Sequence, residues 1–371
     1  MRKARAAKPA SLIAKPAGLI LFSLLFLFAC AQTSATRLSS AAEAQANGDY
    51  ALAETLWLEQ AEAENCFVAQ HNLGSLYFHG HLGKRDFVKA AEWWQRAVDQ
   101  DYAPAMYDLA NMYYYGYDVP QSFEKSFPLH KRAADKGYAP AQNILATYYE
   151  LGEIVYKDEY QAVALYRQAA EQGDAAGQYN MGRKYQNIND NVHAVEWYYK
   201  AATQGEMRAQ YALGDIYLGA DGVNRNEGLA IQYFSLAAEQ GFPPAQRSLG
   251  AMYYNGEGMP KNAQKAKELF ASAAQRNDAR AQYYLGIMLE EEEAYKDAAV
   301  WYEIAALNNL IPAQTKLRYL YYNLGNKALG CAWAYVSGVQ EDVAACDSAL
   351  SKEERAQAFN YVDAINKRIT K

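Results

Sequence analysis

The sequence predicts an all-α protein built as a solenoid of antiparallel helix pairs. The main observation is a recurrence: a glutamine or methionine that follows a small residue returns eight times, at steps of 36 or 32 residues. These positions are Gln70, Met106, Gln142, Gln178, Gln210, Gln246, Gln282 and Gln314. A fixed period in this range is typical of stacked helical hairpins, in which each hairpin contacts only its neighbours.

Residues 244–274 show the repeating unit most clearly. In the first half, Ala245, Leu249 and Tyr253 fall on one face of a helix, and Gly250 leaves room for a second helix to approach. Gly256 suits a helix stop, because left-handed backbone costs least at glycine. The second half carries one apolar stripe: Ala266, Leu269, Phe270, Ala273 and Ala274. One hairpin cannot bury this stripe alone, so it needs copies of itself.

Two further positions recur in step with the glutamine. The first is Leu73, Leu109, Leu145, Met181, Leu213, Leu249, Leu285 and Leu317. The second is Tyr77, Tyr113, Tyr149, Tyr185, Tyr217, Tyr253, Leu289 and Tyr321. The interval from Tyr253 to Ala266 is 13 residues, whereas that from Tyr185 to Ala194 is 9. The shorter steps are therefore interpreted as loop deletions that leave the helices intact.

The pattern A-x-x-x-L-G-x-x-Y-x-x-G, a loop, then A-x-x-W/L-x-x-x-A-A resembles the Sel1-like repeat, a relative of the tetratricopeptide repeat. The resemblance covers roughly residues 43–340. It implies a right-handed superhelical solenoid made of an N-terminal half-repeat and eight hairpins. It also implies a non-catalytic protein–protein interaction scaffold or adaptor, with the first helix of each hairpin lining a concave groove.

The N-terminus predicts export. Residues 1–29 join a basic start to the apolar run 18–29, which is too short to span a bilayer comfortably and is typical of a signal peptide. Leu27-Phe28-Ala29-Cys30 resembles the bacterial lipobox, which implies lipidation at Cys30; ordinary cleavage at an A-x-A site is the alternative. By resemblance, Ala31 after the cysteine favours the outer membrane.

We therefore expect a lipoprotein anchored in the outer membrane and facing the periplasm, or otherwise a soluble periplasmic protein. Residues 30–42 are expected to be a tether. The formal net charge is −6, and the leader contains five of the basic residues, so the processed chain is close to −11. This negative net charge argues against binding of nucleic acid, which needs a basic protein surface.

In each second helix, the position three residues after the first small residue is often aromatic. Its members are Trp57, Trp93, Leu129, Leu165, Trp197, Tyr233, Leu269, Trp301 and Trp333. We interpret this row as a buried ladder between hairpins; a ligand-stacking stripe is the alternative.

The C-terminal residues 341–371 are predicted to form a loop followed by a capping helix. Ser351 suits its N-cap, with Ala356, Phe359, Val362 and Ile365 as the apolar stripe. Cys331 and Cys346 lie 15 residues apart, and an exported chain can oxidise them, so a disulfide is predicted. Cys66 lies too far along the solenoid to join them and is expected to be an inert buried thiol, with an intermolecular link as the alternative.

The sequence contains no H-E-x-x-H, G-x-S-x-G or P-loop motif, and we expect neither an enzyme nor a cofactor. His71, His79 and His81 form a weak metal candidate, which we interpret as solvated loop residues, so no metal site is expected.

Tyrosines dominate two rows that the resemblance places along the groove. The candidate partner-binding residues are Tyr107, Tyr114, Tyr179, Tyr211, Tyr254, Tyr283 and Tyr322. Tyrosine offers contact area, a hydroxyl and little rotamer entropy to lose, which suits binding. The alternative is that these rings are packing filler. The predicted partners are envelope proteins, and a glycan-binding accessory of a polysaccharide secretion system is the alternative function.

Overall fold

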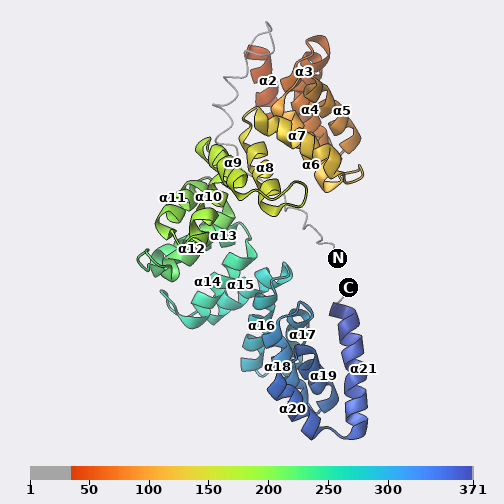
Figure 1. Ribbon diagram of the computed structural model, residues 1–371, viewed down its shortest axis with the longest axis vertical. Helices are drawn as coiled ribbons and strands as arrows, with labels where there is room; N and C mark the ends of the chain where they lie inside the picture. The colour runs from red at the N-terminus through yellow and green to blue at the C-terminus, as the bar shows by residue number, and fades with distance from the viewer. Residues whose placement is uncertain (1–34, 370–371) are drawn as a thin grey trace. The chain divides into compact units, whose positions relative to one another are not determined.

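A computed structural model describes residues 35–369 of the chain. The predicted signal peptide and Cys30 lie outside the described residues. Within 35–369 the chain is all helical (Figure 1), as predicted. None of the described helices is long and apolar enough to cross a membrane.

The helices fall into two compact units. Unit 1 ends at Ile188 and also takes in Thr203–Gly205. Its helices are α2 (Ala35–Ala46), α3 (Tyr50–Ala63), α4 (Phe67–His79), α5 (Phe87–Asp99), α6 (Ala103–Tyr115), α7 (Phe123–Asp135), α8 (Ala139–Leu151), α9 (Glu159–Glu171) and α10 (Ala175–Asn187).

Unit 2 comprises residues 189–202 and 206 onward. Its helices are α11 (Asn191–Thr203), α12 (Met207–Gly219), α13 (Glu227–Glu239), α14 (Pro243–Asn255), α15 (Ala263–Gln275), α16 (Ala279–Glu291), α17 (Tyr295–Leu307), α18 (Ile311–Asn323), α19 (Lys327–Ser337), α20 (Gln340–Ala349) and α21 (Lys352–Ile369).

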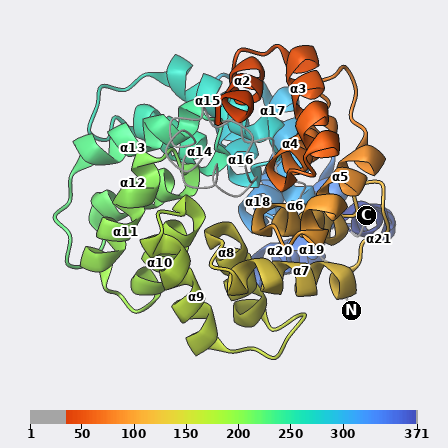
Figure 2. The same cartoon turned by 90° about the horizontal axis from the view of Figure 1, so that it is seen from above.

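Helices α4, α6 and α8 in unit 1, and α14, α16 and α18 in unit 2, each pack on the second helix of their own hairpin and on the preceding second helix. Figure 2 shows that the even-numbered first helices, α4 to α8 in unit 1 and α14 and α16 in unit 2, lie on the inner side of their unit. The second helices lie outside them. This is the layering that the repeat pattern predicts.

The hairpin ends follow from local chemistry. Gly256 ends α14 with φ of +75°, the left-handed conformation expected there. Asn262 begins α15, and its side chain accepts a hydrogen bond from the backbone N–H of Lys265. The N–H of Asn262 donates to the carbonyl of Tyr253, 2.9 Å away, which closes the loop. Asp86, Ser122, Asp158 and Asn226 begin their helices in the same way.

The recurring glutamines join consecutive hairpins. The Gln282 side-chain amide donates to the carbonyl of Ala274, eight residues earlier, at 3.2 Å, and so caps the preceding helix. Gln178, Gln210, Gln246 and Gln314 make the same bond. In several repeats the side-chain oxygen of this glutamine also accepts a hydrogen bond from a side chain at the end of the next second helix. Gln210, for example, accepts from the side-chain amide of Gln240 at 2.8 Å. The recurrence of glutamine therefore reflects buried backbone groups that need partners.

The buried aromatic ladder lies one residue after the predicted row. Its members are Trp94, His130, Tyr166, Tyr198, Phe234, Phe270 and Tyr302. Trp197 is only half-buried, and the Lys200 ammonium lies 4.1 Å from its ring centroid. The prediction that Trp197 lies in the core is therefore wrong. It is also wrong for the half-buried residues Leu129, Leu165, Tyr233, Leu269 and Trp301, whereas Trp57, Trp93 and Trp333 are buried as predicted.

Glycines on the facing first helices help to explain why the buried ring lies one residue after the predicted row. A Cβ atom on Gly214 would lie 2.6 Å from the Phe234 ring, and one on Gly250 would lie 2.9 Å from the Phe270 ring. In the hairpins of Trp94, Phe234, Phe270 and Tyr302 the ladder ring therefore fills the space that a glycine of the same hairpin leaves open, whereas the hairpins of His130 and Tyr166 have alanine at that position. The close approach predicted at Gly250 is present.

Both ends of the described chain contain more helix than predicted. Helix α2 begins at Ala35, inside the expected tether, and buries Leu38 and Ala41 against α3. The predicted loop after residue 340 is wrong, because residues 340–349 form α20. Asp342 of α20 is buried, and its Oδ1 lies 3.0 Å from the Arg318 guanidinium and 3.1 Å from the Tyr319 hydroxyl. These long-range contacts, which no local pattern encodes, hold α20 in place.

Helix α21 packs on α19 and α17, as expected of a capping helix. Ser351 forms the predicted cap: its hydroxyl accepts from the Glu354 N–H at 3.2 Å, while the Glu354 carboxylate accepts from the Ser351 N–H at 2.9 Å. The predicted stripe is wrong in part. Phe359 is 51% exposed and Ala356 is exposed, whereas Ala358 and Ile365 are buried.

Cys331 of α19 and Cys346 of α20 are joined in the structure, with the sulfur atoms 2.08 Å apart. Cys66, the N-cap residue of α4, is buried at 2% exposure and is also disulfide-bonded. The expectation of an inert thiol at Cys66 is therefore wrong.

We predict that the Cys331–Cys346 bond stabilises the C-terminal end of unit 2. The bond closes a loop of 15 residues, so replacing both cysteines with serine should cost up to about 3 kcal/mol of unfolding free energy. Thermal melting of the double variant measures this loss. Mass mapping of a non-reduced digest that found both thiols free would contradict the bond.

Candidate partner-binding surface

The first row of candidate tyrosines lies on the first helices, one residue after the recurring glutamine. Tyr107, Tyr211 and Tyr283 are half-buried, and each contacts the ladder ring of its own hairpin. The ring centroids are 5.7 Å apart for Tyr107 and His130, 5.5 Å for Tyr211 and Phe234, and 5.6 Å for Tyr283 and Tyr302. Each tyrosine thus has one side on the core and part of its surface accessible. Tyr179 occupies the same position and is also half-buried.

The second row lies near the C-terminal ends of the first helices. Tyr114 is half-buried among Tyr115, Phe123 and Tyr148. Tyr254 is half-buried, and its hydroxyl donates to Glu291 of the next first helix. That hydrogen bond, together with burial, raises the pKa of Tyr254 to about 12. Tyr322 is 36% exposed, the most accessible of the candidates.

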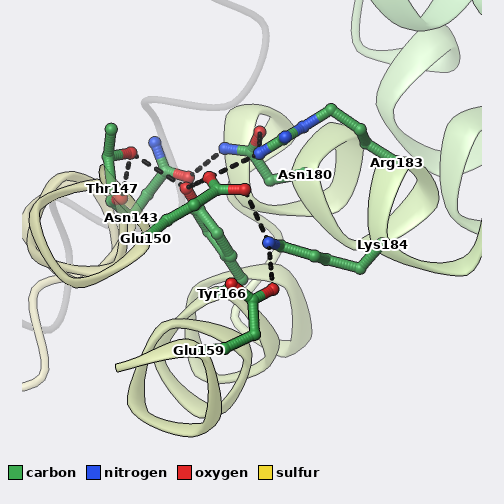
Figure 3. A network of polar contacts seen from close by, with 8 residues as sticks. All are labelled: Asn143, Thr147, Glu150, Glu159, Tyr166, Asn180, Arg183 and Lys184. Carbon is green, nitrogen blue, oxygen red and sulfur yellow. Dashed lines mark hydrogen bonds and ion pairs between the residues drawn. The ribbon is translucent and has the colours of Figure 1, made fainter. Parts of the chain in front are cut away.

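A polar network crosses the inner side of unit 1 from α8 to α10 (Figure 3). Glu150 accepts from Arg183 at 2.6 Å, from Lys184 at 2.6 Å and from the hydroxyl of the ladder residue Tyr166 at 2.7 Å. Burial alone would raise the pKa of Glu150, but these three donors outweigh it and hold the pKa at about 2. Glu150 therefore stays ionised at neutral pH and is unsuited to act as a general base.

Asparagines extend this network. The Asn180 amide donates to the Asn143 side-chain oxygen at 2.7 Å, and both side chains are buried. Lys184 also reaches Glu159 of α9 at 2.5 Å. Unit 2 contains a similar arrangement, in which Glu290 accepts hydrogen bonds from the Tyr302 hydroxyl at 2.7 Å and from the Lys316 ammonium at 2.9 Å. These contacts fix the spacing of neighbouring first helices, and so present the tyrosine rows on a rigid support.

Two of the three candidate histidines lie close together, since the ring centroids of His79 and His81 are 5.5 Å apart. His71 Nε2 lies 2.7 Å from Asp108 Oδ2 of the next first helix, whereas His81 stacks on Tyr50. No group of three potential metal ligands occurs within residues 35–369.

His130 is a core residue that the sequence did not reveal. It occupies the ladder position of the second full hairpin and has no solvent exposure. Its Nδ1 lies 2.8 Å from the Tyr148 hydroxyl, and its Nε2 lies 3.1 Å from the Asn111 side-chain oxygen. Burial lowers the pKa of His130 to about 3, so it is neutral at physiological pH. Reading the ladder in its correct phase would have placed His130 among the aromatic rings.

Comparison with known proteins agrees with this architecture. The Sel1 repeat family model matches seven consecutive segments, at 68–102, 103–138, 139–174, 175–206, 208–242, 243–278 and 279–310. The hairpin α18–α19 lies beyond this match but packs as the others do. No curated protein matches the chain.

Two solved structures are informative. A protective antigen present in uropathogenic Escherichia coli strains, displaying an SLR fold, is 31% identical with a TM-score of 0.64; the match covers 85% of this chain and 72% of that one. A Sel1 repeat protein from Oxalobacter formigenes is 26% identical with a TM-score of 0.58, covering 65% of this chain and 97% of that one.

Proposed function

Because the chain belongs to the Sel1 repeat family, we propose that it is a non-catalytic scaffold of the bacterial cell envelope that binds protein partners through its tyrosine rows. Sel1 repeat proteins are generally protein-interaction scaffolds without catalytic activity. Membership of the family does not specify which surface binds partners. We infer that surface from the side chains that the first helices expose.

The observation that carries the proposal is the state of the seven candidate tyrosines. Six are half-buried and one is 36% exposed, so each ring is held by packing yet keeps accessible surface. Rings fixed in this way lose little entropy when a partner binds. Side chains of this kind are typical of binding hot spots, where truncation costs about 2 kcal/mol or more.

Capture from detergent-solubilised envelopes tests the proposal. The variant Tyr114→Ala/Tyr254→Ala/Tyr322→Ala removes the second row. Its matched control, Tyr156→Ala/Tyr160→Ala/Tyr199→Ala, removes three tyrosines that are more exposed and lie outside the first helices. We expect the first variant to weaken capture by about thirtyfold or more and the control to leave it unchanged.

Thermal melting of both variants must accompany the capture assay, so that loss of fold is not mistaken for loss of binding. Equal capture by the two variants would rule out the tyrosine rows as the binding surface. Retention of a purified polysaccharide in place of proteins would favour the glycan-binding function instead.

We also propose that the chain is anchored in the outer membrane through a lipid on Cys30. The support is the lipobox-like Leu27-Phe28-Ala29-Cys30, which lies outside the described residues. Cys30→Ser should abolish palmitate labelling and release the protein into the soluble periplasm. Unchanged membrane fractionation would contradict the anchor. Cys66 is disulfide-bonded, so the same samples should be mapped to find which cysteine is joined to it. A sulfur atom that carries the lipid in a thioether cannot also form a disulfide, so a bond between Cys66 and Cys30 would contradict the anchor.

A further inference from the structure

Aromatic rings and a carboxylate gather on the inner side of unit 1, at the N-terminal ends of α4, α6 and α8. Tyr102 precedes α6, and its ring centroid lies 4.8 Å from that of Phe67 and 5.5 Å from that of His71. Tyr138 precedes α8, and its ring lies 5.6 Å from that of Tyr107. We call Tyr102, Tyr107, Tyr138 and Asp108 the acidic tyrosine cluster. All four are half-buried, and the Asp108 side chain is 31% exposed, so a ligand can reach them. His71 Nε2 lies 2.7 Å from Asp108 Oδ2, so a ligand would approach the other carboxylate oxygen, Oδ1.

The cluster has a negative electrostatic environment. Burial and, to a smaller extent, the Asp108 carboxylate raise the pKa of Tyr102 to about 12. Burial likewise raises the pKa of Tyr107 to about 12, with smaller contributions from Asp108 and Asp174. Tyr138 shifts in the same direction, first through burial and then through Asp108. The charged groups that act on these three hydroxyls are thus carboxylates, and the hydroxyls remain protonated donors at neutral pH.

Unit 2 contains a cation at the corresponding position. There the residue after the recurring glutamine is Arg247, where unit 1 has Tyr107. Arg247 Nε lies 3.2 Å from the carboxylate of Asp278, which precedes α16 as Tyr138 precedes α8. The side chains of this pair are 18% and 13% exposed. This register of the repeat therefore accommodates a guanidinium beside a carboxylate.

We infer that the acidic tyrosine cluster binds a basic side chain, most suitably arginine, that projects from a protein partner. A guanidinium stacks on aromatic faces and donates to carboxylates, so both components of the cluster suit it. This inference rests on the proposed function and narrows it, since it states the chemistry of the partner segment.

Two fluorescent peptides test the inference with the full-length chain in detergent. One is an alanine–glycine heptapeptide with two arginines, and the other has citrulline at both positions. Citrulline keeps the shape and removes the charge. We expect the arginine peptide to bind about tenfold or more tightly than the citrulline peptide, on the scale of a hydrogen bond to a charged group. Equal affinities, or no measurable binding of the arginine peptide, would overturn the inference.

Asp108→Asn locates the site. It should lower the affinity for the arginine peptide by about tenfold. The control Asp135→Asn makes the same change of charge at an exposed residue of α7 that pairs with Lys131, and should leave the affinity unchanged. Equal affinities of the two variants would contradict the site. If partner capture depends on the tyrosine rows but not on Asp108, only this inference fails; if it depends on neither, the proposed function fails as well.

Discussion

Phe234→Ala should destabilise unit 2 by about 3–5 kcal/mol, the usual cost of truncating a fully buried phenylalanine. Phe234 has no solvent exposure, packs against Gly214 and Tyr211, and belongs to the same buried cluster as Ala237 and Leu249. The cavity would lie between helices that contact only their neighbours, so the loss need not propagate evenly along the solenoid. We therefore expect thermal melting to broaden as well as shift to lower temperature.

Trp197→Ala is the matched control, because Trp197 belongs to the row one residue earlier along the second helices. It is half-buried under Lys200, so its truncation should cost clearly less than that of Phe234. A larger loss for Trp197 than for Phe234 would contradict the position of the ladder.

Acidification should destabilise unit 1 through His130. The pKa of His130 is about 3 in the folded chain, because of burial, and near 6.5 when the chain unfolds. Between these values the unfolded chain binds the proton and the folded chain does not, so stability falls as the pH decreases. The stabilisation is fully present above pH 6.5, and about 2 kcal/mol of it should be lost by pH 5.

His130→Tyr isolates this effect, since tyrosine already occupies the ladder position in three other hairpins. The groups around His130 are the Asn111 amide and Tyr107 from α6, Ser126 from α7 and the Tyr148 hydroxyl from α8, and none of them titrates between pH 5 and 7. Urea unfolding at pH 7 and pH 5 should therefore show a smaller decrease for the variant. An equal decrease in both proteins would assign the pH dependence to other groups.

The helices could be predicted from the sequence because each repeat carries its own signals. Gly256 and Asn262 mark a helix end and a helix start by local backbone chemistry, and the pattern recurs in step. The ladder was misplaced by one residue because positions three and four after the small residue both belong to the apolar stripe. The small residue on the facing helix, such as Gly214, decides between them, and that pairing is a tertiary contact.

The candidate site was less predictable for the same reason. The two tyrosine rows follow from the register of the repeat, and the structure places them on the first helices. The two cationic partners of Glu150, however, lie 33 and 34 residues away on another helix. The buried contact between Arg318 and Asp342 likewise joins residues whose local patterns say nothing of each other. Contacts of this kind depend on how hairpins stack, which a period in the sequence does not specify.

Site-specific photo-crosslinking with the photoreactive residue benzoylphenylalanine tests the binding surface most directly. Tyr114, on first helix α6, is the test position in unit 1, and Tyr160, on second helix α9 with 92% exposure, is the control. If partners bind along the tyrosine rows, irradiation of envelopes should crosslink a partner at Tyr114 and not at Tyr160. Adducts at Tyr160 without adducts at Tyr114 would place the binding surface on the second helices and contradict the account.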